Sequence, residues 1–477
     1  MSILLQELHA FHGNDGHHFI FDPESMVFFQ SDDQTFQYIR RNRGGSSSGQ
    51  TVPANGRSSQ FQQMEDVLLK ERARVSQRYQ RASTGKHTIS RLTILTTTAC
   101  NLNCTYCYAD GGAYGGPVNR LSASNASTAI RNILDYYKGI DAIQFFGGEP
   151  LLNPGLIESV CRDCETMFAQ GKMPNLPRFG ATSNGTIWNE RIASLLKRYK
   201  ISLNISIDGP QEVHDRSRID VKGNGSFHRV FRTLEALKEH EIPFSVEVTY
   251  NTITMRAGYS VWDIISFLAE HDIYHPHIVP AAFAPTDGNR WTPPERKQLA
   301  QHYREATQRA VASLVEGKPM LFSYITGILQ PLLLKIPQPL VCAAGVHDLA
   351  IDTAGNIYPC FMFIGQDEFI QHSALQSLDD DDYRRRGHDF YLQNAKEHRS
   401  SCENCWARNI CTSCLGMHQI ENGRLDGKTI NCLIIQTVAE TLMTELARLQ
   451  QTPAQWKRFV DNYRSFRLGS AQPIEIC

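Results

Sequence analysis

One short segment carries three cysteines and decides the fold: Thr98-Ala99-Cys100-Asn101-Leu102-Asn103-Cys104-Thr105-Tyr106-Cys107. It follows directly on Arg91–Thr97, an apolar and β-branched run that predicts a buried strand. Three thiolates on one loop can bind three irons of a cubane cluster and leave the fourth open, whereas closed zinc sites and fully ligated clusters take four ligands. Three buried thiols or an incomplete zinc site are the alternatives, but cysteines so close together rarely arise by composition. The segment therefore predicts an iron–sulfur cluster with one open iron.

Around this segment, strand and helix patterns alternate regularly from about Thr88 onward. We expect strands at Arg91–Thr97, Ala142–Phe146, Arg178–Thr182, Ser202–Ile207, Phe244–Thr249 and His277–Ala281. Helices are expected between them, for example at Ala123–Tyr137, at Phe227–Glu239 and, with Asn189 as the N-cap, at Asn189–Tyr199. This alternation predicts an α/β fold with a parallel sheet and right-handed crossovers, either doubly wound or a partial barrel.

Glycine-rich and polar motifs follow successive predicted strands. Gly147-Gly148-Glu149-Pro150 comes after the second strand and Ser183-Asn184-Gly185 after the third. Ser206-Ile207-Asp208-Gly209 ends the fourth, and Asp215-Arg216-Ser217-Arg218 lies shortly beyond. Each motif alone is an ordinary loop signal. Because the carboxyl ends of parallel strands share one rim, where α/β barrels collect their active sites, the motifs together predict one site.

The cysteine spacing, the aromatic residue before the last cysteine and the order of these motifs resemble the radical S-adenosylmethionine (SAM) superfamily. The resemblance implies a partial (β/α)6 TIM-like barrel in which Cys100, Cys104 and Cys107 hold a [4Fe–4S] cluster whose open iron binds SAM. It implies cleavage of SAM to a 5′-deoxyadenosyl radical, which abstracts a hydrogen atom from an unactivated C–H bond. The GGEP motif would engage the SAM amino group, and Ser206 and Arg218 its ribose or carboxylate. The cofactor-binding residues implied in this way are Tyr106, Gly147, Gly148, Glu149, Ser183, Asn184, Ser206, Asp208 and Arg218.

A second set of cysteines occupies the later part of the chain: Cys342, Cys360, Cys402, Cys405, Cys411, Cys414 and Cys432. A zinc ribbon is the alternative, since paired CxxC motifs mark it, but seven cysteines exceed the needs of one zinc ion. The pattern, with Gly355-x4-Cys360 before the paired motifs, is similar to the SPASM domain. That resemblance implies two auxiliary [4Fe–4S] clusters and thus three clusters in the chain.

The resemblance also divides these cysteines between the two auxiliary clusters. Cys402, Cys405, Cys411 and Cys432 would ligate one cluster fully. The other cluster, on Cys342, Cys360 and Cys414, would keep one iron for a substrate atom or for a side chain such as His347 or Asp348. Cys411 and Cys414 are separated by two residues rather than the usual three, so the assignment of these two cysteines stays open.

SPASM members act mostly on peptides or proteins, and two subclasses compete here. Anaerobic sulfatase-maturating enzymes oxidise a Cys or Ser of a sulfatase, whereas ribosomal-peptide maturases install thioether, C–C or C–O crosslinks or related oxidations. Sulfatase maturases typically have an aspartate closely after the GxxxxC cysteine, where this chain has Phe361 and Met362. They also generally begin close to their radical SAM core, whereas this chain has about 85 residues ahead of it. The peptide-maturase subclass is therefore expected, and the catalytic acid or base stays unassigned.

The segment ahead of the core is expected to form a small domain. His17–Phe21 and Met26–Phe29 predict a hairpin, with a helix starting at Ser31 or Asp32. The segment loosely resembles the winged-helix-like domains that capture a leader peptide at a β-edge; a plain capping hairpin is the alternative. A mobile polar stretch is expected from Arg40 to about Ser59. The expected domains are 1–85, 86–320 (barrel), 335–435 (SPASM) and 436–477, a C-terminal helix near Leu433–Leu449 with a polar tail.

Composition limits the partners of this chain of 477 residues. A net charge of −1 provides no field for nucleic acid, and no long apolar run or secretory signal is evident, so a cytoplasmic protein without a membrane partner is expected. The expected partners are a precursor peptide with a leader and an external low-potential electron donor of flavodoxin or ferredoxin type. A ferredoxin-like electron carrier and a structural zinc protein are the alternatives. Cys161 and Cys164 are expected to be structural thiols and Cys477 to lie in the tail. A packed role is the commoner one for His275 and His277, and contact of one of them with SAM or substrate is the alternative.

Overall fold

The centre of the molecule is a mixed sheet of nine strands. The computed structural model describes residues 5–42, 59–82 and 88–469, so most of the polar stretch 40–59 and Cys477 lie outside the described residues. The sheet has the order β12-β11-β10-β4-β5-β6-β7-β8-β9. The six expected strands form its parallel part: β4 (Arg91–Thr97), β5 (Ala142–Gly147), β6 (Arg178–Ser183), β7 (Ser202–Ser206), β8 (Phe244–Tyr250) and β9 (His277–Pro280).

The strand order decides between the two topologies expected for the parallel part. Each strand from β4 to β9 pairs in parallel with the next one along the chain. A doubly wound sheet instead reverses its order at a switch point, whereas consecutive strands are neighbours in a barrel. The sheet therefore has the order of a barrel, with β9 at one open edge.

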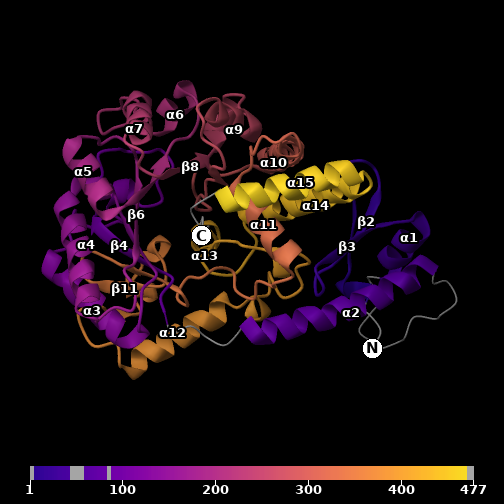
Figure 1. The fold of residues 1–477 in the computed structure, drawn as a ribbon, viewed down its shortest axis with the longest axis horizontal. Helices are drawn as coiled ribbons and strands as arrows, with labels where there is room; N and C mark the ends of the chain where they lie inside the picture. Colours follow the sequence, from indigo (N-terminus) through magenta and orange to yellow (C-terminus); the bar gives the residue numbers. More distant parts are fainter. Residues whose placement is uncertain (1–4, 43–58, 83–87, 470–477) are drawn as a thin grey trace.

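Helices follow these strands and form a ring around them (Figure 1). The side chain of Asn189 accepts a hydrogen bond from the backbone N–H of Ile192 at 3.0 Å, which confirms the expected N-cap. The helices are α3 (Ala123–Tyr137), α4 (Pro154–Ala169), α5 (Glu190–Tyr199), α6 (Gln211–Ser217), α7 (Phe227–Glu239), α8 (Thr252–Arg256), α9 (Val261–Glu270) and α10 (Pro293–Val315). Cys161 and Cys164 are buried in α4, as expected of structural thiols.

The region from Val341 to Cys432 shares a core with the barrel. A hydrophobic cluster forms around Tyr358, Phe363 and Phe390 and includes Leu95 of β4. Its elements are too short to show a period in the sequence, and β10 completes them by pairing in parallel with β4. The elements are β10 (Asp348–Ile351), β11 (Asn356–Tyr358), β12 (His372–Ser373), α12 (Asp381–Asn394) and α13 (Leu415–Asn422), preceded by α11 (Ser323–Leu334).

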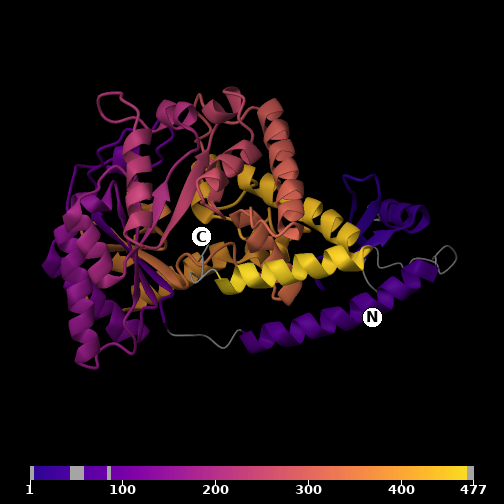
Figure 2. The ribbon, with the colours of Figure 1, turned by 45° about the horizontal axis from the view of Figure 1, so that its top comes forward.

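The N-terminal segment is a three-stranded antiparallel sheet with two helices, at one end of the molecule in both views (Figures 1 and 2). The expected hairpin is β2 (His18–Asp22) and β3 (Val27–Ser31), to which β1 (His9–His12) adds a strand that was not expected. The expected helix is α1 (Asp33–Asn42), and Asp32 Oδ1 accepts from the Thr35 N–H at 2.6 Å. Along β2, Phe19 and Phe21 pack into the main core, whereas Ile20 faces a small cluster shared with α2 (Ser59–Ala82).

Two helices end the described chain, where one helix and a polar tail were expected. The expected helix is α14 (Ile430–Gln450), which runs across the expected domain boundary at 435. The tail is instead largely helical, as α15 (Pro453–Gly469). Trp456, Phe459 and Tyr463 recur at helical spacing in α15, and Phe459 is buried. Among the described helices none is long and apolar enough to cross a membrane.

Candidate functional site

A cavity of about 850 Å³ opens inside the curved sheet. Thiols from both cysteine sets line it: Cys100, Cys104, Cys107, Cys342, Cys360 and Cys414. Seven of the residues expected to bind SAM line it as well: Tyr106, Gly147, Gly148, Ser183, Asn184, Ser206 and Arg218. The fold therefore brings the two sets of motifs, which are far apart in the sequence, to one space.

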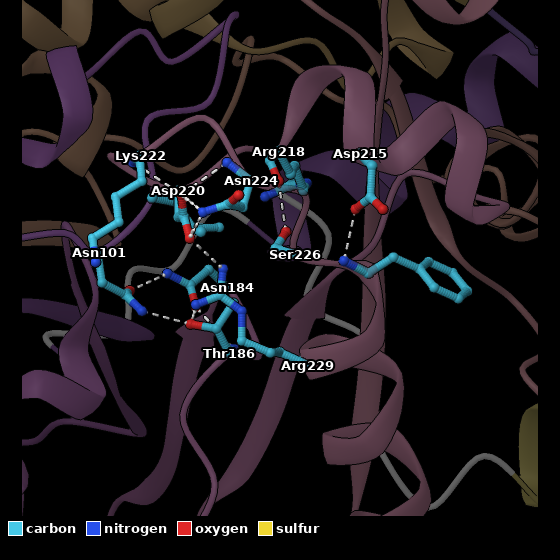
Figure 3. A network of polar contacts seen from close by, with 12 residues as sticks. Asn101, Asn184, Thr186, Asp215, Arg218, Asp220, Lys222, Asn224, Ser226 and Arg229 are labelled. Atoms are coloured by element: carbon cyan, nitrogen blue, oxygen red, sulfur yellow. Dashed lines mark hydrogen bonds and ion pairs between the residues drawn. The ribbon is translucent and has the colours of Figure 1, made fainter.

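The first cysteine loop is held in place by neighbouring backbone and side chains. Cys100 Sγ accepts from the backbone N–H of Leu102 at 3.4 Å and from Asn184 Nδ2 at 3.8 Å. Asn184 also donates to Asn101 Oδ1 at 2.9 Å and accepts from Thr186 (Figure 3). The Ser183-Asn184-Gly185 motif therefore supports the cysteine loop directly, which its sequence signal alone did not reveal.

Two glycines bring the β5 end close to this loop. Gly147 has φ +140°, and a Cβ there would lie 2.1 Å from the carbonyl oxygen of Thr97. A Cβ on Gly148 would lie 2.3 Å from the carbonyl oxygen of Ala99. Any larger side chain would displace backbone at both positions. The glycines thus let the chain pass directly under the loop that carries Cys100.

The carboxylate of Glu149 is fully buried and does not line the cavity. Its oxygens accept hydrogen bonds from Ser183 Oγ at 3.0 Å and from the backbone N–H groups of Asn184 and Leu151 at 2.7 and 3.0 Å. Burial raises the pKa of Glu149 to about 7. The side chain therefore ties the second motif to the third.

A buried ion pair joins the fourth motif to the helix after it. Asp208 Oδ1 lies 3.1 Å from Arg218 Nε, and Asp208 Oδ2 accepts a hydrogen bond from the hydroxyl of Tyr106. The guanidinium of Arg218 lies over the Tyr106 ring, 5.5 Å from its centroid. His214 Nδ1 accepts from the backbone N–H of Asp208 at 3.3 Å. Asp208 and Tyr106 thus orient Arg218, which lines the cavity.

Loop contacts hold the segment that carries Arg218. Ser226 Oγ donates to the Arg218 carbonyl at 2.6 Å and lies 2.9 Å from His214 Nε2. Asp220 accepts from the backbone N–H groups of Lys222 and Asn224, both at 2.9 Å (Figure 3). These contacts fix a loop that the sequence pattern left undefined.

The later cysteines divide in space. Cys402, Cys405, Cys411 and Cys432 do not line the cavity. In the described part of the chain no three Cys, His or carboxylate side chains converge closely enough to hold one metal ion. A cubane cluster is wider than one ion, so its thiolates lie further apart. The donor sets therefore suit iron–sulfur clusters in kind, with three cavity-facing thiols from the first cysteine loop and three from the later set.

A buried lysine links three backbone segments around the cysteines that lie outside the cavity. Lys396 is 3% exposed, and Nζ donates to the carbonyl oxygens of Gln338, Arg408 and Cys411 at 2.7, 2.6 and 2.7 Å. All three ammonium hydrogens are satisfied in this way. Lys396 had no sequence signal, because its partners are backbone carbonyls.

The cavity also contains polar residues from inside the barrel that the sequence motifs did not include. Glu247 on β8 and His277 on β9 line it, as do Arg91 and Asp348, which form an ion pair. His347 lines the cavity too, while His275 Nε2 lies 2.9 Å from Thr326 Oγ1. Alternation along each strand was the available signal for Glu247, since Val246 and Val248 beside it are buried in the core.

Comparison with known proteins agrees with this geometry. The model of the radical SAM superfamily matches residues 94–269, which include the cysteine loop and every motif at the carboxyl ends of the parallel strands. The chain contains a radical SAM domain. Radical SAM proteins bind a [4Fe–4S] cluster and SAM, and the thiols, the glycine cradle and Arg218 fit both groups.

Three curated relatives show how far the similarity extends. An uncharacterized protein of Methanocaldococcus jannaschii is 33% identical over 33% of this chain and 52% of its own length, so the match spans about half of that relative. A cysteine-type anaerobic sulfatase-maturating enzyme of Clostridium novyi is 22% identical over 66% of this chain and 84% of its own length. The radical SAM cyclopropyl synthase TigE of Paramaledivibacter caminithermalis is 25% identical over 41% of this chain and 42% of its own length.

Solved structures share the fold over more of the chain. The structure of native anSMEcpe with bound AdoMet has a TM-score of 0.62 and 18% identity, and covers 76% of this chain and 100% of its own. The same protein with AdoMet and a Cp18Cys peptide has a TM-score of 0.61 at 18% identity and covers 75% of this chain and 98% of its own. Streptococcus suis SuiB bound to S-adenosylmethionine has a TM-score of 0.50 at 14% identity and covers 89% of this chain and 98% of its own. This radical SAM enzyme therefore shares the α/β fold of these proteins.

Proposed function

We propose that this radical SAM enzyme oxidises a ribosomally made peptide and installs a thioether, C–C or C–O crosslink or a related oxidation. The observation that supports the proposal is the single cavity lined by three thiols of the first loop and three of the later set. When bound, SAM and a reduced cluster supply a 5′-deoxyadenosyl radical that abstracts a hydrogen atom from the peptide. An external flavodoxin- or ferredoxin-type donor would supply the electron.

The residues have distinct proposed roles in holding these groups. Cys100, Cys104 and Cys107 would ligate the SAM-binding cluster, with the Gly147–Gly148 backbone and the side chains of Ser206 and Arg218 around SAM. Tyr106 and Asp208 would orient Arg218, through the contacts described above. Glu149 and Ser183 would fix Asn184 beneath the cluster loop. The protein's own contribution is thus to position SAM and to keep water from the reacting atoms.

A SPASM-type arrangement of two auxiliary clusters is proposed for the later cysteines. Cys342, Cys360 and Cys414 line the cavity, which suits a cluster with an iron open toward the substrate. Cys402, Cys405, Cys411 and Cys432 lie away from the cavity and would form the fully ligated cluster. Burial raises the pKa of Cys411 to about 12, the Lys396 ammonium lowers it, and the nearby Cys432, Cys405 and Cys402 raise it, so these four thiols lie close together. This division keeps the assignment that the sequence resemblance implied.

Sulfatase maturation is the second candidate, and the relatives support it equally. The C. novyi relative is a cysteine-type anaerobic sulfatase-maturating enzyme, and anSMEcpe is described with a bound peptide. Both candidates share a peptide substrate and a side-chain oxidation. They differ in whether the oxidised residue becomes crosslinked.

Two features favour crosslinking. Phe361 and Met362 line the cavity after Cys360, at the place where sulfatase maturases typically have an aspartate. The anSMEcpe fold covers 76% of this chain, whereas the SuiB fold covers 89%. We propose a leader-binding role for residues 1–85.

The N-terminal sheet is well placed for such a role. His9 stacks on Trp406, with ring centroids 4.0 Å apart, and its Nε2 lies 2.8 Å from Glu440 Oε1. Arg408 forms an ion pair with Glu24 in the turn between β2 and β3. Trp406 and Arg408 lie between Cys405 and Cys411. A leader added to an edge of this sheet would therefore lie next to the cysteines outside the cavity.

The test compares two sets of synthetic peptides with reconstituted enzyme, SAM and dithionite under anaerobic conditions. One set contains short peptides encoded beside this gene, and the other contains sulfatase-site peptides with Cys or Ser. The proposal expects a mass loss of two hydrogens with a crosslink visible by fragmentation in the first set. Oxidation confined to the Cys or Ser of the second set would establish sulfatase maturation instead. Deletion of residues 1–85 should reduce turnover only of peptides that carry a leader.

A further inference from the structure

Two titratable side chains lie side by side inside the barrel and belong to none of the sequence motifs. Glu247 on β8 and His277 on β9 are register partners in the parallel pairing of these strands. Both line the cavity. Since neighbouring strands are about 4.8 Å apart, register partners on one face are within reach of each other. The pair therefore presents a carboxylate and an imidazole to the space that holds the substrate.

The carboxylate of Glu247 is fixed by a chain of hydrogen bonds across two strands. Asn204 Nδ2 donates to Glu247 Oε2 at 2.8 Å. Asn204 Oδ1 in turn accepts from Ser245 Oγ at 3.1 Å, which sets the orientation of the amide. Glu247 is thus held beside His277 by β7 and by its own strand.

The imidazole of His277 has capacity to bind a proton. Its Nδ1 is buried and has no hydrogen-bond partner among the described residues. Burial lowers the pKa of His277 and Glu247 raises it, so the ring is neutral near pH 7 and can act as a base. Helices α11 and α14 pack against β9. Among their described residues that line the cavity, the titratable one is Tyr324 of α11, whose hydroxyl donates to Asn431.

We propose that His277, positioned by Glu247, accepts the proton that the peptide loses during its oxidation. The inference rests on the proposed function. The C–H hydrogen atom leaves to the SAM-derived radical and gives 5′-deoxyadenosine. The substrate then loses a proton from an adjacent S–H, O–H or N–H group to His277 and one electron to an oxidised iron–sulfur cluster, and a new bond to carbon forms. In total the peptide loses two hydrogens.

This assignment gives the cavity a proton acceptor, which the residues directly after Cys360 do not provide. The positions directly after Cys360 are Phe361 and Met362, which cannot take a proton. Asp348, the other acidic residue that lines the cavity, already forms an ion pair with Arg91. Glu247 acts through His277 and is a positioning residue, because its charge favours protonated imidazole.

The first experiment needs no peptide. The full chain is treated with diethyl pyrocarbonate across a pH series, and modification of each histidine is quantified by peptide mass spectrometry. His277 should be modified through the cavity, with a pH profile that moves to lower pH in Glu247→Gln, which keeps the shape and removes the charge. The exposed His228 is the internal reference and should not move. An unreactive His277, or a profile that Glu247→Gln leaves in place, overturns the pairing whatever the peptide screen gives.

The second experiment uses the peptide that the wild type modifies in the screen above. His277→Gln should lower product formation about 100-fold while 5′-deoxyadenosine still forms, because proton transfer follows hydrogen abstraction. Glu247→Gln should shift the pH dependence of product formation in the same direction as the modification profile. Equal loss of nucleoside and product in His277→Gln would contradict the role. A wild type that forms nucleoside but modifies neither peptide set refutes the proposed function instead, which distinguishes the two failures.

Discussion

The two cysteine groups of this chain are built in opposite ways. Cys100, Cys104 and Cys107 lie within one loop after β4, and contacts from the ends of β5 and β6 hold that loop. The later seven are spread from Cys342 to Cys432, across loops that β10, α12 and α13 separate and onto the first turn of α14. A short loop on a strand end presents its thiols by local geometry, whereas the dispersed set depends on tertiary contacts such as those of Lys396. The difference predicts that the two groups fail for different reasons.

The first group should break when its backbone cradle is filled. Gly147→Ala places a Cβ 2.1 Å from the Thr97 carbonyl oxygen at φ +140°, a conformation that L residues rarely adopt. We expect a loss of about 3 kcal/mol of folding free energy and of most SAM cleavage. Chemical denaturation and nucleoside quantification measure the two effects. Gly155→Ala is the matched control, because a Cβ there meets no atom within 4 Å. Normal stability and SAM cleavage in Gly147→Ala would show that the cradle is not required.

The second group should break when its central cation is removed. Lys396→Met leaves the carbonyl oxygens of Gln338, Arg408 and Cys411 buried without their donor. The expected cost is about 3 kcal/mol, together with loss of iron from the later cysteines while the first group keeps its cluster. Iron analysis and electron paramagnetic resonance of the reduced protein separate the two groups. The exposed Lys428→Met is the control. Equal iron loss from both groups would contradict the independence inferred from their construction.

Much of the first group was predictable from the sequence because its signals are local. All six parallel strands fell within a residue or so of their expected bounds, and α3 and α7 matched theirs. The motifs at the strand ends also met at one cavity, since parallel strands place their carboxyl ends together. Glu149 was expected among the SAM contacts, but its carboxylate lies under the cavity wall, bonded to Ser183 and Asn184.

The second group was less predictable because its contacts are long-range. β10 finds its partner β4 about 250 residues earlier in the chain, a pairing recorded between Asp348 and Arg91 that no local pattern encodes. The aromatic residues of α15 did have helical spacing, which was masked by their polar neighbours. Lys396 and Glu247 act through backbone carbonyls or register partners that are known only once the strands are placed.

A smaller effect, the pH dependence of stability, tests the role of His214 beside Arg218. Burial lowers the pKa of His214 to about 4, below the unfolded value near 6.5. Between these values the unfolded state binds more protons, so stability falls as the pH decreases. From about pH 7.5 to about pH 5.5 the His214 contribution is about 1.4 kcal/mol. His214→Gln should flatten this part of the pH dependence of the denaturation midpoint, whereas the exposed His228→Gln should not. Identical slopes in the wild type and both variants would refute the assignment.

The most direct test of the radical SAM account is anaerobic 5′-deoxyadenosine formation by reconstituted wild type and by Cys104→Ala, with SAM and dithionite. Mass spectrometry quantifies the nucleoside, and iron analysis verifies the clusters. We expect nucleoside from the wild type and none from Cys104→Ala, whose later cysteines still bind iron. No nucleoside from wild-type protein with its full iron complement would contradict it.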